Sequence, residues 1–327
     1  MNRRAAATLA GLLLLLAAAI ALRLLAGRDE SGPVLSPEFI DLRLMRVGAG
    51  VVVGVTLGVA GVFLQALLRN PLASPDVLGL ASGSGLGVMV VAYAAYRSAG
   101  IIGAESQPGL GMGAAAVVGA LAALGAVWAL GQRRGMLDPV TLVLVGVAVA
   151  MACSAASQLV RHLLPDQGLA AGRLLLGSLR DPGGAELAVT GGVATVGLGA
   201  GLFLARAMDA ASLGEDEARS VGVPLAWLRT ALFVLSGVLT AASVVLAGPV
   251  GFVGLVCPHV VRLMAGPRHG VLVVGTAMAG ATLVVLCDAV VRLVDLGGGQ
   301  MPLGVVTSLI GAPVLVWLLR RNFGRRA

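Results

Sequence analysis

The chain contains no lysine, so all 23 of its basic residues are arginine. A phosphate-binding loop of the Walker type requires a lysine that contacts the β- and γ-phosphates of ATP. The chain therefore lacks such an ATP site of its own. It also shows no nucleophile–base pair and no spacing of metal ligands, so we predict neither an enzyme nor a bound metal or cofactor.

Charged and aromatic residues are also scarce, at 12% and 3%, whereas 58% of the 327 residues are hydrophobic. This composition excludes a soluble globular protein and favours a membrane protein of many helices. Arginines without interleaved aromatic residues do not indicate a nucleic-acid interface. The three cysteines, Cys153, Cys257 and Cys287, lie in apolar surroundings without paired spacing, so we expect small buried side chains.

Apolar runs long enough to cross the hydrocarbon core predict nine membrane helices. They cover residues 5–25, 47–68, 77–96, 112–131, 139–160, 187–207, 229–247, 271–292 and 303–319. A tenth apolar stretch, 249–265, is shorter and is interrupted by Pro249 and Pro258, which predicts a broken or short crossing. We therefore expect an all-α integral membrane protein with about ten transmembrane helices, forming a single domain over residues 1–327.

An even number of crossings places both termini on the same side of the membrane. Of the 23 arginines, 14 fall on that side and 9 on the other, so the termini are predicted to be cytoplasmic. The N-terminal leucine run imitates a signal peptide, but Leu22–Leu25 replaces a small-residue cleavage site. We expect a retained first helix.

A charged segment interrupts the apolar sequence between Arg206 and Arg229, and we call residues 206–229 the charged island. Residues 212–215, Ser-Leu-Gly-Glu, read as a capping box that starts a short helix. Gly222 and Pro224 are typical of its end. A short helix with defined ends on the cytoplasmic side indicates a contact surface for another protein.

Two further segments are rich in proline and glycine. Residues 69–79 predict a stiff cytoplasmic turn between the second and third helices. Residues 248–262 place three glycines, two prolines and His259 at membrane depth, where interrupted backbone lines a pathway or is buried in protein. His259 could be a metal or haem ligand, but no second ligand is evident, so we favour a buried, hydrogen-bonded histidine.

Taken in order, these segments resemble the permease subunits of ATP-binding-cassette (ABC) importers for iron-siderophores, haem and vitamin B12 (cobalamin), the FecCD-type family. The match extends from about residue 43 to residue 319. Its landmarks are residues 43–46, 69–79, 213–215, 248–262, 288–292, 302–304 and 311–313. Two positions depart from the family pattern, because Met45 stands where a proline is usual and Gln300 where a glutamate is usual. We expect the Met45 change to loosen the start of a helix.

The resemblance implies a type II ABC importer permease in the bacterial inner membrane. Its expected partners are a second permease subunit, most simply in a homodimer, two ATPase subunits that use ATP and Mg, and a periplasmic or lipid-anchored substrate-binding protein. It also implies that the charged island forms the coupling helices that contact the ATPase. The residues concerned are Ser212, Leu213, Gly214, Glu215, Asp216, Glu217 and Arg219.

The resemblance further implies that Arg43, Arg46 and Arg292 meet acidic residues of the binding protein. Arginine at outer helix ends suits carboxylates. Asp288, four residues before Arg292, could instead neutralise that arginine within the helix, and both roles can coexist. Motif residues expected near the pathway are Asn70, Pro71, Gly251, Gly254, Pro258, His259, Asp288, Pro302 and Gly304.

One alternative function remains at this point, a secondary transporter driven by an ion gradient. Asp288 would then be its proton or sodium site, because an acid within a membrane segment is a functional candidate. A single acid near the end of its helix, without a helix break, gives this alternative little support. The importer is the favoured prediction.

Overall fold

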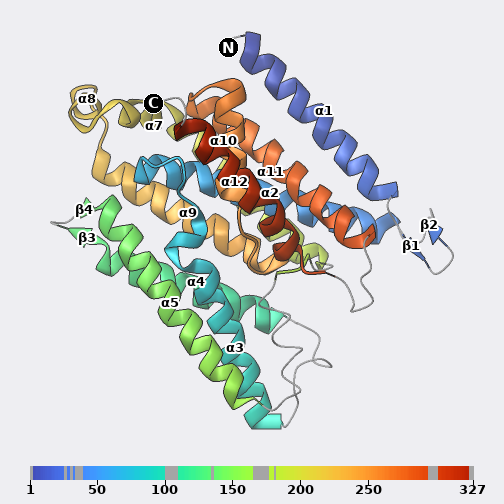
Figure 1. Ribbon diagram of the computed structural model, residues 1–327. Helices are drawn as coiled ribbons and strands as arrows, with labels where there is room; N and C mark the ends of the chain where they lie inside the picture. Colours follow the sequence, from blue (N-terminus) through green and yellow to red (C-terminus); the bar gives the residue numbers. More distant parts are fainter. Residues whose placement is uncertain are drawn as a thin grey trace.

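The computed structural model describes residues 3–25, 28–29, 32–33, 40–99, 110–133, 136–164, 177–179, 182–293 and 301–323. These residues are almost entirely helical (Figure 1). Two antiparallel pairs of two-residue strands are the exception, β1 (Arg28–Asp29) with β2 (Gly32–Pro33) and β3 (Gln132–Arg133) with β4 (Met136–Leu137).

Ten helices correspond one to one with the ten predicted crossings. They are α1 (Arg3–Leu25), α2 (Ile40–Leu68), α3 (Leu80–Ala99), α4 (Leu110–Leu130), α5 (Pro139–Leu163), α7 (Gly184–Leu213), α9 (Leu225–Ala247), α10 (Val253–Ala265), α11 (His269–Leu293) and α12 (Leu303–Phe323). The short helices η2 (Pro75–Leu78) and α8 (Glu215–Ser220) lie between crossings. The predicted all-α fold is confirmed.

Seven of these helices are long and apolar enough to cross a membrane by themselves. The apolar parts of α10 and α12 are shorter. Helix α3 carries Tyr93, Tyr96 and Arg97 towards its end, which lowers its mean hydropathy. The prediction of a broken or short crossing is confirmed in its short form, because α10 has only 13 residues, continues through Pro258 and is preceded by non-helical residues 248–252.

Helix α2 is the centre of the molecule, and 78% of its most apolar window is buried. It packs against α11, α9 and α7, whereas α3, α4 and α5 pack together beside this group (Figure 1). Glycines on α2 allow these close contacts. A Cβ atom added at Gly58 would lie 2.7 Å from the Thr276 carbonyl oxygen, and one at Gly54 or Gly61 would overlap backbone of α11 or α10. The glycines of α2 therefore allow the backbones of α10 and α11 to approach it closely.

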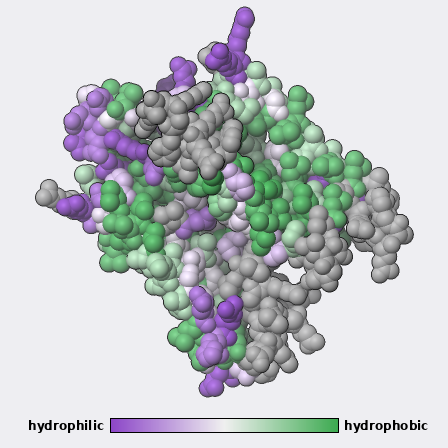
Figure 2. Space-filling model, in the orientation of Figure 1, coloured by the Kyte–Doolittle hydropathy of each residue, from purple (hydrophilic) through white to green (hydrophobic). Residues whose placement is uncertain are grey.

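Both termini and α8 lie at the same end of the molecule (Figure 1). Large apolar side chains cover much of the surface between the two ends, as the green areas in Figure 2 show. A surface of this kind suits lipid contact. Cys257 and Cys287 are buried as expected, and Cys153 is half-buried.

Candidate functional site

The charged island contains a short helix, but it starts later than predicted. Helix α7 continues through Leu213, and the Ser212 hydroxyl donates to the Asp209 carbonyl at 2.6 Å. The predicted capping box is wrong, because an N-cap needs non-helical backbone and Ser212 is still within α7. Gly214 separates the two helices instead, and the Glu217 side chain fills the space that a Cβ at residue 214 would need.

The end of α8 follows the prediction. Gly222 adopts a left-handed conformation with φ of 81°. Its N–H donates to the Arg219 carbonyl at 3.0 Å, and the Val223 N–H donates to the Ala218 carbonyl at 2.9 Å. These two bonds form a Schellman motif, which closes a helix at a left-handed residue. Pro224 follows directly and caps the start of α9.

The side chains at the junction of α7 and α8 divide into an inward and an outward set. Glu215 accepts a hydrogen bond from Arg229 of α9 and lies 3.7 Å from Arg219. The Arg229 hydrogen bond lowers the pKa of Glu215. In contrast, Leu213 is 77% exposed, and the Asp216 side chain is 98% exposed. Leu213 and Asp216 therefore form the face that a partner protein could touch.

Two further contacts hold the island to the membrane helices, and neither was evident from sequence spacing. The Asp209 carboxylate accepts from the His269 backbone N–H at 2.9 Å and lies 2.7 Å from its Nδ1, so it caps the start of α11. Arg69 donates to the Ala211 carbonyl at 2.7 Å. The island is thus held by α9, by α11 and by the turn after α2.

A buried ion cluster lies away from the charged island, near the end of α1, the start of α2 and the end of α11. The Asp288 carboxylate lies 2.5 Å from Arg23 Nε and 3.1 Å from Arg46 Nη2. Asp288 and Arg46 are only 2% and 6% exposed. Asp288 therefore bonds to arginines on two other helices, which the i, i+4 spacing to Arg292 did not indicate.

The ion cluster corrects one expectation about the outer arginines. Arg46 was expected to reach water, but its guanidinium is enclosed with Asp288 because α1 and α11 cover it. Arg43 is half-buried and donates to the Leu24 carbonyl at 3.0 Å, and Arg292 lies half-buried in the last turn of α11. Met45 lies five residues inside α2, so its expected effect on a helix start is also wrong. Gln300 lies outside the described residues.

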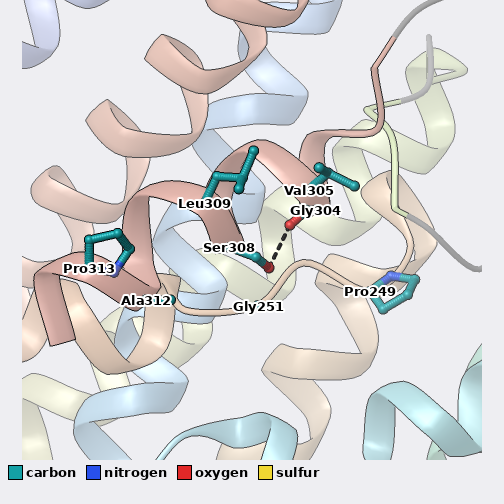
Figure 3. A pocket seen from close by; sticks show the side chains of 8 residues that line it. All are labelled: Pro249, Gly251, Gly304, Val305, Ser308, Leu309, Ala312 and Pro313. Carbon is teal, nitrogen blue, oxygen red and sulfur yellow. Dashed lines mark hydrogen bonds between the residues drawn. The ribbon is translucent and has the colours of Figure 1, made fainter. Parts of the chain in front are cut away.

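A cavity of about 600 Å³ lies between α12 and the segment that precedes α10 (Figure 3). It is lined by Pro249, Gly251, Gly304, Val305, Ser308, Leu309, Ala312 and Pro313. None of these side chains is charged, and the Ser308 hydroxyl donates to the Gly304 carbonyl at 2.7 Å. Pro302 lies directly before α12, so three of the predicted pathway residues, Gly251, Pro302 and Gly304, lie in or beside this apolar cavity.

The segment before α10 has unusual backbone. Phe252 caps α10 in a left-handed conformation with φ of 67°, which is rare for a residue other than glycine. Gly254 packs against Pro75, since a Cβ at residue 254 would lie 2.8 Å from the proline Cδ. The Gln65 amide lies 3.5 Å from the Gly254 carbonyl. The predicted interruption is therefore a packed structure rather than a loose loop.

His259 lies on α10 and is buried, as predicted. The predicted hydrogen bond is not observed, because neither ring nitrogen has a hydrogen-bond partner within the described part of the chain. No group of three or more His, Cys, Asp or Glu residues is placed to hold a metal among the described residues. Asn70 and Pro71 form a tight turn in which the Asn70 Oδ1 accepts from the Leu72 N–H at 3.0 Å.

Comparison with known proteins extends these observations. The model of the FecCD transport family matches residues 24–321. The chain is 33% identical to the hemin transport system permease protein HmuU of Yersinia pestis, over 88% of this chain and 85% of that protein. It is 36% identical to the cobalamin import system permease protein BtuC of Halobacterium salinarum, over 85% of this chain and 72% of that protein.

The fold is similar to a solved structure as well. That structure is described as an inward-facing conformation of a metal-chelate type ABC transporter, and the TM-score is 0.83 at 28% identity. The similarity covers 97% of this chain and 99% of the other chain. The sequence landmarks, the ten-helix arrangement and the relatives agree, so this chain belongs to the FecCD transport family and is a multi-pass membrane permease subunit of an ABC importer.

Proposed function

We propose that two copies of this chain form the membrane part of an importer for a haem, a corrinoid or an iron chelate in the bacterial inner membrane. Two ATPase subunits would bind the charged island on the cytoplasmic side, and a binding protein would deliver the cargo outside. The observation that supports this proposal is the junction of α7 and α8, where Leu213 at the end of α7 and Asp216 on α8 are exposed to solvent while Glu215 is bonded to Arg229 of α9.

An exposed helix can transmit force only if it is attached to the helices that must move. Asp209 attaches the island to α11, Glu215 attaches it to α9, and Arg69 attaches it to the turn after α2. Closure of an ATPase dimer would therefore move three membrane elements together. Rigid-body movements of this kind switch access between the two sides of a membrane protein.

The cargo class is proposed from the relatives together with the cavity. The similar proteins are named for hemin, cobalamin and metal-chelate transport. The cavity beside α12 presents no charged side chain. A lining of this kind would distinguish poorly between large cargoes, so selection would rest with the binding protein.

Docking of the binding protein is proposed for Arg43 and Arg292, whereas Arg46 supports the ion cluster from within. Arg43→Glu should weaken docking, most visibly at low salt, because exposed charge pairs are screened by ions. The Leu44→Gln variant, at an exposed neighbouring position, is the matched control. Binding of the loaded binding protein to permease in nanodiscs measures the effect, and equal affinity at low salt would exclude Arg43 from the interface.

The ion-gradient alternative gains no support from Asp288. Its carboxylate is already bonded to Arg23 through one oxygen and to Arg46 through the other, so neither oxygen is open to coordinate a sodium ion. No observation favours a second function over the importer.

Uptake by proteoliposomes tests the proposed function. They should contain this chain, its co-encoded ATPase and its binding protein, and should be offered haem, a ferric siderophore or cobalamin with and without ATP. We expect uptake of one cargo that requires both ATP and the binding protein. Uptake by this chain alone under an ion gradient would overturn the proposal.

A further inference from the structure

The turn of residues 69–79 touches two parts of the molecule that are otherwise separate. Its first residue contacts the end of α7, next to α8, and its later residues contact the segment before α10, which lines the cavity. A single short turn thus lies between the island and the cavity wall.

Arg69 makes the contact at the first end. Its guanidinium donates to the Ala211 carbonyl at 2.7 Å, and Ala211 lies in the last turn of α7, three residues before Gly214. Arg69 also has a left-handed backbone, with φ of 49°. Such backbone is uncommon for a residue with a side chain, and a native structure keeps it only where the surrounding contacts enforce it.

The middle of the turn is stiff. Asn70 accepts at its carbonyl from the Ala73 N–H at 3.1 Å and at its side chain from the Leu72 N–H at 3.0 Å. Pro71 and Pro75 each fix one backbone angle. The Gln65 amide lies 3.4 Å from the Ala73 carbonyl, which attaches the turn to α2. A segment with so many internal restraints would move as one body.

Asp76 makes the contact at the second end. Its carboxylate accepts from the Ser74 hydroxyl at 3.0 Å and lies against the backbone of residues 251 and 252, since a Cβ added at Gly251 would be 3.6 Å from Oδ2. Phe252 is the second residue in the described structure, besides Arg69, that has a positive φ without being glycine. Gly251, its neighbour, lines the cavity within reach of both Asp76 and Ser308. Asp76 therefore holds the strained residue at the cavity wall.

We infer that Arg69 and Asp76 are positioning residues that make this turn a rigid link between the α7–α8 junction and the cavity wall at residues 249–252. The inference rests on the proposed function, because it gives the movement of α8 a route to the cavity. A displacement of the Ala211 carbonyl moves Arg69, the stiff turn follows, and Asp76 shifts the backbone of Phe252. Loss of either residue separates ATP hydrolysis from transport.

Coupling is measured as cargo molecules transported per ATP hydrolysed in proteoliposomes that contain the complete transporter. Asp76→Ala should lower this ratio about tenfold, the effect expected when a buried polar group loses its partner, while ATP hydrolysis stays within about twofold of wild type. Asp76→Asn keeps the shape of the side chain and an oxygen that can accept from Ser74, so it should keep most of the coupling. A residue that acted only on folding would instead lower both rates together.

Arg69→Gln tests the other end independently. Arg69 is exposed, so this variant remains informative if Asp76→Ala fails to assemble. Like Asp76→Ala, Arg69→Gln should lower the coupling ratio. Asp138→Ala is the matched control, because the Asp138 carboxylate also caps a helix start, at 2.9 Å from the Thr141 N–H, but belongs to the hairpin before α5.

A second readout follows the cavity wall directly. A cysteine introduced by Ser308→Cys should react with a soluble maleimide at a rate that changes when ATP is added, and Asp76→Ala should abolish that change. Unaltered coupling and unaltered labelling in Asp76→Ala and Arg69→Gln would overturn the link while leaving the proposed function intact. If the wild-type transporter shows no ATP-dependent uptake, the proposed function fails and the link fails with it.

Discussion

Glu215 looks like an ordinary surface acid in the sequence, but its side chain holds α8 against α9. Its side chain is 41% exposed, but one oxygen is bonded to Arg229, which is nearly buried. An exposed ion pair of this kind contributes at most about 1 kcal/mol to stability. The ion pair therefore acts mainly by orienting α8 against α9.

The pH dependence of this pair follows from the direction of the pKa shift. Because Arg229 lowers the pKa of Glu215 below 4.5, the stabilisation is complete above that value and is lost as the pH falls through the lower, folded-state pKa. We expect the difference in thermal stability between wild type and Glu215→Gln to be constant from pH 8 to pH 5. A difference that shrinks already between pH 7 and pH 6 would contradict the assigned contact.

Asp288 is the second residue whose role differs from its appearance in the sequence. Asp288→Ala would leave Arg23 and Arg46 buried beside each other without their shared carboxylate. Breaking a buried ion pair costs about 3–5 kcal/mol, so we expect a large loss of thermal stability in detergent. Asp41→Ala, an exposed acid in the first turn of α2, is the control. If Asp288→Ala lost no more thermal stability than Asp41→Ala, the ion cluster would not contribute to the stability of the fold.

At the scale of elements, the junction of α7 and α8 uses different side chains to hold the island in place and to contact the ATPase. Leu213→Asp changes an exposed side chain that has no role in holding the island, so it should remove ATPase binding without affecting insertion or folding. Co-purification of the ATPase measures the effect. Leu44→Asp, an equally simple change at the outer end of α2, should leave ATPase binding intact. Unchanged co-purification of Leu213→Asp would exclude the junction of α7 and α8 as the coupling surface.

The contact between α2 and α10 depends on a glycine. A Cβ at Gly61 would overlap the Gly254 carbonyl, so Gly61→Ala must push α10 away from α2. Overpacking of this kind costs about 1–3 kcal/mol. Gly125→Ala on α4 meets no atom within 4 Å and should be neutral. Thermal unfolding of the two purified variants checks the difference, and equal melting temperatures would contradict the close packing.

For the whole molecule, the helices and helix ends that depend on local sequence pattern could be predicted. The ten apolar helices, the short crossing of α10 and the end of α8 at Gly222 follow from hydropathy and from the backbone preferences of proline and glycine. Ser212 was misassigned because a capping box and the last turn of a helix can have the same residues. In the structure α7 remains helical through Leu213, and α8 starts after Gly214.

The contacts between distant segments could not be predicted in the same way. Asp288 with Arg23, Asp209 with His269 and Arg69 with Ala211 join residues far apart in sequence, and no periodicity relates them. The polar groups in each contact are neighbours only because tertiary packing brings their segments together. Arg46 was expected at the surface for the same reason, since its position in α2 does not reveal that α1 and α11 cover it.

The pairing of Arg23 with Asp288 has a consequence for biosynthesis. The two residues are 265 positions apart, so the ribosome needs roughly 10–50 s to make the second after the first. Throughout that interval the first helix is in the membrane with its arginine still lacking this carboxylate. Arg23 lies in the last turn of α1, where its long side chain can extend to the aqueous surface until Asp288 is inserted. The first helix can therefore adopt its final position only when synthesis of the chain is almost complete.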